Sequence, residues 1–337
     1  MAKRTGGFIG QDGINAPDPA TGVTGTAGDG QVTVSFTAPS DVGGAAITGY
    51  NVQSADGSGT WQSFYDLTEA AYDSVNFSVS GQDADPYGLF FRSDGAKMYV
   101  AGDAGNDINE YNLSTPWTVS SASYSQNFSV ASQESAPNGV FFKTDGTKMF
   151  VVGTATDTVY EYALSSAWDI SSASYGSVSF SVGSQDTVPT DLAFKADGTK
   201  MFIVGNTGNN VYEYALSSAW VVSSASYTRS FSLASQETGP TGLYFSSDGL
   251  NMFVIGAAGV NKYVLSSAWD ISSASYSQTF SVSSQESDPQ ALFFKSDGTK
   301  MYVLGSSSDT VYQYTTGETD YPTASPVTVT GLSNGTS

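Results

Sequence analysis

The stretch FFKTDGTKMFVVGTATDTVYEYAL, from Phe141 to Leu164, contains the pattern that decides the fold. Short apolar runs lie on either side of Asp145-Gly146, and a polar segment separates the second run from the third. An Asp-Gly pair between such runs predicts a tight β-hairpin, because glycine readily takes a positive φ. The stretch therefore predicts three short consecutive strands.

This unit is repeated five times along the chain. A preceding element, FSVxSQ(E/D)xxP with small variations, begins at Phe77, Phe128, Phe180, Phe231 and Phe280. Each copy then has an Asp-Gly pair, at Asp94, Asp145, Asp197, Asp248 and Asp297. The copies are about fifty residues long, which is the length typical of repeat folds such as propellers. The five repeats extend from about Tyr72 to Thr316.

Each copy predicts four strands, which is the pattern of a β-propeller blade. The fourth is the SSASYSQNFSV type of segment, which follows a tryptophan in four copies. The first copy begins with its outer strand and the last ends after its third strand, near Tyr314. We therefore predict five blades, with Tyr72–Val79 completing the last blade and closing the ring. The blade motif, FKSDGTKMYV at Phe294–Val303, resembles the F-x-x-D-G-x-x-(M/L)-Y-V units of bacterial and surface-layer propellers, a resemblance that implies architecture but no activity.

The flanking segments resemble a fibronectin type III domain. Val32–Phe36 and Ile47–Gln53 match its second and third strands, and Val327–Leu332 matches its fifth. The propeller would then be inserted into a β-sandwich that is incomplete at the C-terminus, as folds with adjacent ends permit. The predicted all-β organisation is an N-terminal arm (1–19), a first fibronectin-like part (20–65), the propeller (66–316) and a second fibronectin-like part (317–337).

Composition excludes several classes of site. The 337 residues include 32 acidic and 12 basic ones, for a net charge of −20, and neither cysteine nor histidine. Such a chain repels nucleic acid, and it has no thiolate nucleophile, no Ser-His-Asp triad and no histidine metal ligand. The N-terminus lacks the apolar stretch of a Sec signal peptide, and we expect no membrane insertion.

The candidate ligand-binding residues are Gln-acid pairs that precede the proline of each repeat. A five-fold array of them could bind sugars or cations multivalently. The alternative is that they cap backbone groups within each blade. We predict no catalytic residue, cofactor or metal ligand, although Ca²⁺ is conceivable at carboxylate-rich loops such as Gln82–Pro86. The pairs are Gln82-Asp83, Gln133-Glu134, Gln185-Asp186, Gln236-Glu237 and Gln285-Glu286.

The opening MAKRTGGFIGQDGINAPDPATGVT resembles virion proteins of tailed phages, especially marine and cyanobacterial ones. The resemblance implies a structural or adhesive, non-enzymatic protein of the particle: a capsid decoration, head fibre or tail fibre. Its partners would be other capsid or tail proteins and host surface glycans, and its location the virion. One alternative is a bacterial surface or secreted adhesion module that binds carbohydrate. Another is a propeller enzyme, such as a glycoside hydrolase or lactonase.

Overall fold

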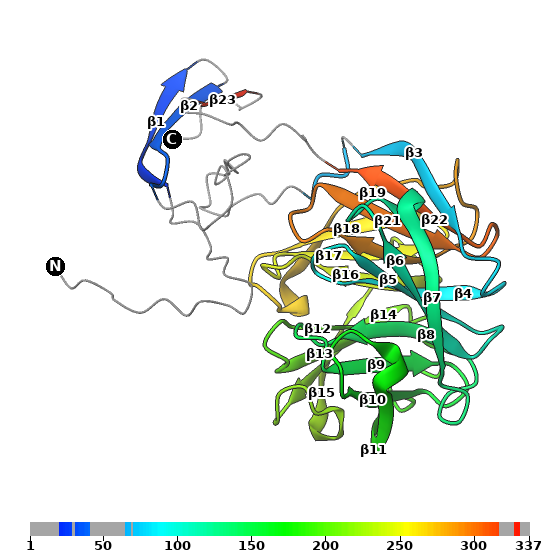
Figure 1. The fold of residues 1–337 in the computed structure, drawn as a ribbon. Coiled ribbons are helices and arrows are strands. Elements are labelled where there is room, and N and C mark those ends of the chain that lie inside the picture. The colour runs from blue at the N-terminus through cyan, green and yellow to red at the C-terminus, as the bar shows by residue number, and fades with distance from the viewer. Residues whose placement is uncertain (1–19, 29–30, 41–64, 69, 317–326, 331–337) are drawn as a thin grey trace. The chain divides into compact units, whose positions relative to one another are not determined.

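The protein is described here from a computed structural model, over residues 20–28, 31–40, 65–68, 70–316 and 327–330 (Figure 1). The chain divides into two compact units. One unit is Phe64–Gly317, and the other combines the segments on either side of it.

The larger unit is a five-bladed β-propeller, as predicted. Blade 1 contains β4 (Pro86–Phe91), β5 (Lys97–Gly102), β6 (Asp107–Leu113) and β7 (Ala122–Ser129). Blade 2 contains β8 (Pro137–Phe142), β9 (Lys148–Gly153), β10 (Thr158–Leu164) and β11 (Ala173–Ser181). Blade 3 contains β12 (Pro189–Phe194), β13 (Lys200–Gly205), β14 (Asn210–Leu216) and β15 (Ala225–Ser232). Blade 4 contains β16 (Pro240–Phe245), β17 (Asn251–Gly256), β18 (Gly259–Leu265) and β19 (Ala274–Phe280).

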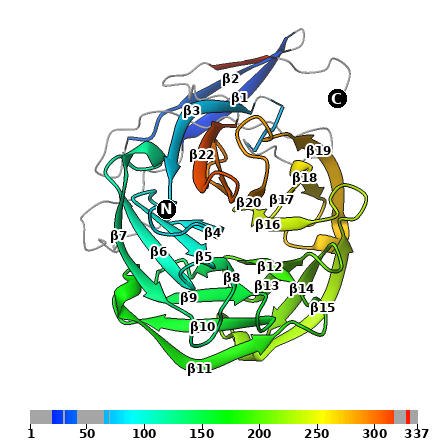
Figure 2. The same cartoon turned by 90° about the vertical axis from the view of Figure 1, so that its right-hand side faces the viewer.

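Blade 5 closes the ring in the way the sequence predicts. It contains β20 (Pro289–Phe294), β21 (Lys300–Gly305), β22 (Thr310–Thr315) and, from the start of the propeller, β3 (Ala71–Ser78). β3 pairs antiparallel with β22, with Thr315 opposite Ala71. Figure 2 shows the first strands of the blades around the centre and the fourth strands at the rim.

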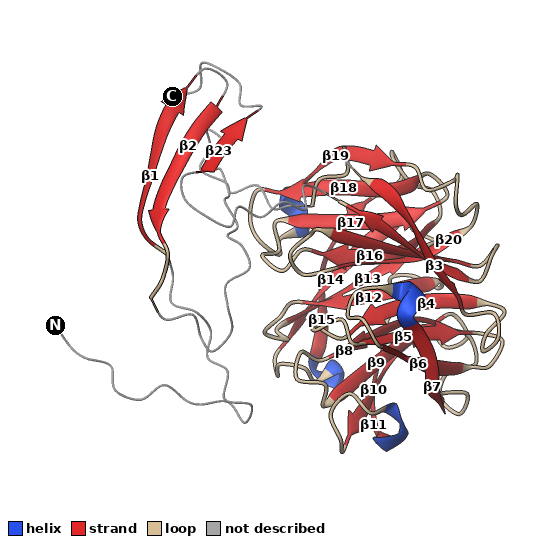
Figure 3. Cartoon of the chain, turned by 45° about the horizontal axis from the view of Figure 1, so that its top comes forward, coloured by secondary structure: helices blue, strands red, loops and turns tan. Residues whose placement is uncertain are grey.

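The fourth strand begins later than predicted. In blades 1 to 4 the SSASY segment starts with a 3₁₀ turn, and the strand begins at the alanine that follows (Figure 3). In blade 2 the Asp169 side chain accepts a hydrogen bond from the Ser171 backbone and so caps this turn. The four turns are Val119–Ser121, Ile170–Ser172, Val222–Ser224 and Ile271–Ser273.

A tryptophan precedes each of these turns and packs against the Asp-Gly hairpin of its own blade. A Cβ added at Gly198, for example, would lie 2.3 Å from the Trp220 ring, and Gly198 has a φ of +73°. Trp220 also stacks on Phe194 of its own blade and on Phe150 of the preceding blade. The tryptophans therefore fix the interfaces between blades and are not free for sugar rings.

Tyr65 takes the tryptophan's place in blade 5. It contacts Gly298 in the Asp-Gly hairpin and packs on Phe294 of blade 5 and Phe253 of blade 4. The segment from Tyr65 onwards follows the register of the segment from Trp168, since Asp66 caps Thr68 as Asp169 caps Ser171. The closing segment thus begins at Tyr65, seven residues before the predicted Tyr72.

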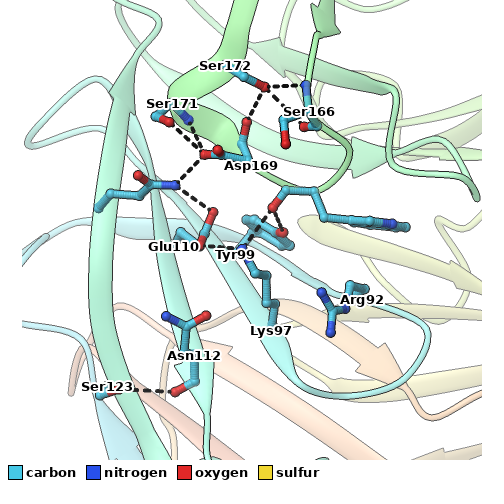
Figure 4. Close-up of polar contacts among 12 residues, drawn as sticks. Arg92, Lys97, Tyr99, Glu110, Asn112, Ser123, Ser166, Asp169, Ser171 and Ser172 are labelled. Atoms are coloured by element: carbon cyan, nitrogen blue, oxygen red, sulfur yellow. Dashed lines mark hydrogen bonds and ion pairs between the residues drawn. The ribbon is translucent and has the colours of Figure 1, made fainter. Parts of the chain in front are cut away.

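Polar contacts also join neighbouring blades at the end of the propeller where the Asp-Gly hairpins lie (Figure 4). Lys97 pairs with Glu110 at 2.6 Å within blade 1, and its ammonium also donates to the Trp168 carbonyl of blade 2. The Tyr99 hydroxyl donates to that same carbonyl at 2.7 Å. Each buried Lys-Glu pair is therefore tied to the chain of the next blade, which stabilises the order of blades around the ring.

The described part of the smaller unit is a three-stranded antiparallel sheet. Its order is β1 (Thr21–Gly28), β2 (Gln31–Thr37) and β23 (Val327–Thr330). Residues before and after the propeller therefore share one sheet. The predicted arm 1–19 and the predicted strand Ile47–Gln53 lie outside the described residues, as do the last two residues of the predicted strand Val327–Leu332.

Candidate functional site

The predicted Gln-acid pairs hold the loops at one end of the propeller, which we call the pocket end. The Glu134 carboxylate, in blade 2, accepts hydrogen bonds from the Ala136 and Ala155 backbone amides and the Thr156 hydroxyl. It thereby joins the loop before the first strand to the loop after the second. The equivalent carboxylates are also buried and also accept backbone amides: Asp83, Asp186, Glu237 and Glu286.

Four of the five glutamines accept a hydrogen bond from a tyrosine on the third strand of their own blade. The Gln82 side-chain oxygen accepts from the Tyr111 hydroxyl at 3.4 Å, and Gln133, Gln185 and Gln285 repeat this contact. This geometry is the one expected if the pairs cap groups within each blade rather than bind a ligand. Ligand binding by these residues stays a prediction, although none of the ten lines the cavity described next.

That cavity, of about 420 Å³, opens at the pocket end where the first strands of all five blades converge. We call it the axial pocket. Most of its lining comes from three positions in each repeat: the residues just before and just after the proline, and the residue after the second strand. Its lining residues are Tyr87, Asp103, Asn138, Thr154, Val188, Thr190, Asn206, Gly239, Thr241, Ala257, Asp288, Pro289 and Gln290.

At these three positions the near-identical repeats carry chemically different side chains. The residue after the proline is Tyr87, Asn138, Thr190, Thr241 or Gln290 in blades 1 to 5. The flanking proline and the glycine that ends the second strand are the same in every blade. The scaffold is thus five-fold repeated, whereas the pocket is asymmetric, with Tyr87 in blade 1 and the small Gly239 and Ala257 in blade 4.

Hydrogen bonding orients the polar lining on blades 3 to 5. The Thr190 hydroxyl donates to the Pro240 carbonyl at 3.0 Å, and the Thr241 hydroxyl donates to the Pro289 carbonyl at 2.9 Å. The Gln290 amide donates to the Ser306 hydroxyl, so its carbonyl oxygen remains as an acceptor. In blade 2 the Asn138 side-chain oxygen is buried without a hydrogen-bond partner. This part of the pocket therefore offers acceptors to a ligand that brings donors.

The pocket is acidic. Burial, and after it the charge of Asp85, raises the pKa of Asp103. Burial also raises the pKa of Tyr87, and the carboxylates of Asp85, Asp103 and Asp288 raise it further. Of the described residues that line the pocket, none is a lysine or an arginine.

The basic residues gather at the opposite end, beside the Asp-Gly hairpins. All ten lysines and arginines in the described part of the chain lie there, in ion pairs or bonded to backbone carbonyls. The electrostatic field at the pocket end therefore favours cations and neutral molecules over anions. These basic residues are Arg92, Lys97, Lys143, Lys148, Lys195, Lys200, Arg229, Lys262, Lys295 and Lys300.

One further acidic group lies on β12 next to a lining residue of the pocket, and the sequence pattern had not singled it out. Asp191 follows the lining residue Thr190 on β12, and its carboxylate accepts the Leu192 and Leu243 amides, both at 2.8 Å. Burial raises the pKa of Asp191 to about 7, outweighing these two bonds. The signal was present: Gly88, Gly139, Gly242 and Ala291 occupy the same position in the other repeats.

The described residues contain no group of three or more acidic side chains placed to hold a metal ion. Calcium binding therefore remains a prediction from the sequence. Nor does any helix of the described chain have the length and apolar character needed to cross a bilayer.

No protein-family model and no curated protein matches this chain. Solved propellers do. A periplasmic gluconolactonase of Pseudomonas aeruginosa is 16% identical, with 73% of this chain and 70% of that one covered and a TM-score of 0.41. A Bacteroides fragilis protein to which 6-phosphogluconolactonase activity is ascribed is 14% identical, covers 91% and 82%, and has a TM-score of 0.45. The propeller domain of Cps50 from Myceliophteria thermophila is 10% identical, covers 68% and 70%, and has a TM-score of 0.39.

These matches correct the predicted function. Two of the three propellers carry the names of lactonases, which are hydrolases, and none is a virion protein. The prediction of a structural or adhesive, non-enzymatic protein is therefore wrong. It rested on the resemblance of the opening residues to virion proteins, and it left the divergence of the repeats around the pocket out of account. The similarity itself extends to the fold and assigns no substrate. The phage resemblance, virion partners and virion location stay predictions that nothing here tests.

Proposed function

We propose that the propeller binds a small polyhydroxylated molecule, such as a sugar or a sugar lactone, in the axial pocket. The observation that carries the proposal is the asymmetric lining. A symmetric scaffold needs only equivalent side chains at equivalent positions, yet the five blades present different polar groups here. Concave sites with a few convergent polar groups are the usual places for small ligands.

The chemistry of the lining selects the ligand class. Hydroxyl groups can donate to the Asp103 and Asp288 carboxylates, and Tyr87 offers an aromatic surface for a sugar ring. A phosphorylated or carboxylated ligand would meet two carboxylates and no cation, which costs several kcal/mol. The pocket is therefore suited to gluconolactone-like molecules rather than to their phosphorylated forms.

Blocking the pocket tests this proposal. Thr154→Trp places a large ring at the pocket edge, and Thr115→Trp makes the same change at an exposed position among the hairpins of the other end. We expect saturation-transfer NMR to detect D-glucose and D-sorbitol on the native protein and on Thr115→Trp, but not on Thr154→Trp. Absence of binding to the native protein, or its persistence in Thr154→Trp, contradicts the proposal. Melting temperatures check that both variants fold.

A second candidate function is hydrolysis of an uncharged sugar lactone, which Asp191 favours. A carboxyl group that exchanges its proton near neutral pH is suited to general acid-base catalysis. Water would add to the lactone carbonyl carbon and the ring C–O bond would break, giving a hydroxy acid that the acidic pocket repels. We expect proton release from glucono-δ-lactone to slow by about a hundredfold in Asp191→Ala. An unchanged rate contradicts this role.

We also propose that the smaller unit is fibronectin III-like and that the propeller is inserted into it. Supporting this, β2 and β23 coincide with the predicted second and fifth strands, and the sheet order is β1-β2-β23. First, second and fifth strands are neighbours in one sheet of such sandwiches. An experimental structure that pairs Ile47–Gln53 with this same sheet would contradict the proposal.

A further inference from the structure

We propose that Asp191 forms a subsite at the base of the axial pocket that takes an ammonium group, so that the preferred ligands are polyols carrying an amine. This inference rests on the proposed binding function and names the ligand class within it.

The position of Asp191 is unique in the ring. The equivalent residues, Gly88, Gly139, Gly242 and Ala291, carry at most a methyl group, so only one of the five blades places a functional group here. A Cβ added at Gly139 would lie 2.8 Å from the Asp191 Oδ1 atom, which shows how close this carboxylate comes to blade 2. Asn138, just before Gly139, and Thr190, just before Asp191, both line the pocket. Asp191 itself is 9% exposed.

Within the described part of the chain, the charge of Asp191 has no cationic partner. Its oxygens accept two backbone amides, and the strands packed against β12 are β8, β9, β13 and β16. The titratable side chains of these strands are Lys148, Lys200 and Tyr244. Both lysines pair with glutamates at the hairpin end, and Tyr244 packs on Tyr65 there. A buried carboxylate without a counter-charge is costly, and a ligand cation would remove that cost.

An ammonium group fits the rest of the pocket as well. It brings three donors, and the lining residue Asn138 directly precedes Gly139, the blade 2 position that the Asp191 carboxylate approaches. The rim carboxylates Asp103 and Asp288 draw cations towards the pocket, since no basic residue lines it. A neutral polyol could use the same hydroxyl contacts but would leave Asp191 uncompensated.

Three probes that differ at one end of a six-carbon chain provide the test. D-Glucamine carries an ammonium there, D-sorbitol a hydroxyl and D-gluconate a carboxylate. By titration calorimetry at pH 8 we expect glucamine to bind at least tenfold more tightly than sorbitol, and gluconate not to bind. Asp191→Ala introduces the alanine that blade 5 has at the equivalent position, Ala291. In this variant glucamine should bind no better than sorbitol. Asp191→Gly, with the residue of positions 88, 139 and 242, serves if the alanine variant does not fold.

The pH dependence separates a direct role from a structural one. Lowering the pH from 8 to 6 protonates most of a carboxyl group with a pKa of about 7, so the native affinity for glucamine should fall about tenfold. In Asp191→Ala this fall should vanish, and in Asp197→Ala, an acid of the same blade at the hairpin end, it should remain. Equal affinities for glucamine and sorbitol would overturn the subsite while leaving the proposed function intact. Failure of all three probes to bind would remove the proposed function as well.

Discussion

Lys300 reaches across the closure of the ring to Asp73, with its ammonium 2.6 Å from the carboxylate, although the residues are 227 positions apart. In blades 1 to 3 the corresponding lysine pairs with a glutamate on the third strand of its own blade. Blade 5 has Gln313 at that position, and Gln313 itself donates to Asp73. Strand β3 thus supplies the carboxylate that the third strand of blade 5 lacks.

We therefore expect Asp73→Ala to lower the free energy of unfolding by about 2 kcal/mol, because it leaves a largely buried ammonium without its partner. Urea denaturation followed by tryptophan fluorescence measures this change. Lys143→Ala is the control, since it removes a pair whose Asp145 partner is 49% exposed. Such surface pairs contribute less than about 1 kcal/mol. Equal losses in the two variants would show that the closure pair has no special role.

The Asp73 contribution should also depend on pH. Burial by itself would raise the pKa of Asp73, but bonds from Lys300, Thr315 and Gln313 outweigh it and hold the pKa below its usual value. The stabilisation is therefore complete above the unfolded-state pKa of about 4 and is lost as the pH falls through the lower folded value. The difference between native protein and Asp73→Ala should be constant from pH 5 to 8 and shrink below pH 4. A difference that grows on acidification would contradict this assignment.

Tyr65 should contribute more to closure than the ion pair does. It is 2% exposed and packs between Phe294 and Phe253 of two blades. We expect Tyr65→Ala to cost about 3 kcal/mol or more in urea denaturation, as large-to-small changes in cores do. Tyr124→Ala, at a tyrosine that is 44% exposed, should cost less than about 1 kcal/mol. If both cost the same, the register that places Tyr65 at the tryptophan position would be in doubt.

Periodicity made the propeller predictable, because near-identical copies repeat every signal five times. Blade number and the pairing of β3 with β22 followed from counting strand types. Tyr65 was missed because only Asp66, Ala70 and Tyr72 of its segment are identical to the blade 2 copy, so the alignment of WDISSASY with YDLTEAAY was not evident. The contact of Tyr65 with Gly298, 233 positions later in the chain, exists only once the ring is closed.

The same periodicity that revealed the fold made the site harder to predict. Repetition draws attention to residues that recur, and the recurring carboxylates cap loops. Asp191 and the pocket lining are departures from the repeat, and a single departure has no periodicity to mark it. That Asp191 approaches Gly139 of blade 2 and accepts the Leu243 amide of blade 4 is a consequence of ring geometry. Its raised pKa follows from burial there, which no local pattern encodes.

Two other departures from the repeat predict stabilising substitutions. Asn106 and Asn209 adopt positive φ in blades 1 and 3, and their amides, oriented to suit their surroundings, donate to the Ser135 and Thr238 carbonyls of the next blade. Asp157 and Asp309 take this position in blades 2 and 5, where one oxygen of each is buried without a hydrogen-bond partner. A carboxylate has no hydrogen to donate there. We expect Asp157→Asn and Asp309→Asn each to raise the free energy of unfolding by about 1 kcal/mol at pH 7.

The gain should disappear in acid. Burial, then Glu134 and Asp186, raise the pKa of Asp157, and burial, then Asp85 and Glu286, raise that of Asp309. A raised carboxyl pKa means that the folded state loses stability as the pH rises through the interval between the unfolded and folded values. Thermal melts at pH 4 and pH 7 should therefore show the stabilisation only at pH 7. A loss of stability at both pH values would show that these carboxylates have partners that asparagine cannot replace.

Asp191 allows the sharpest test of this linkage, because its pKa is raised to about 7 by burial with no charged neighbour involved. Between the unfolded-state value of about 4 and pH 7 the folded state retains a proton that the unfolded state has released, so this residue destabilises the fold progressively over that interval and by a constant amount above it. The full effect is roughly 3–4 kcal/mol. We expect the free energy of unfolding of Asp191→Ala, relative to the native protein, to rise by that amount from pH 4 to pH 8 in urea titrations. The alanine variant loses two amide bonds at every pH, which shifts the curve without changing its slope. A flat difference across this range would mean that Asp191 titrates normally, and with it the argument for a protonatable group at the base of the pocket would fail.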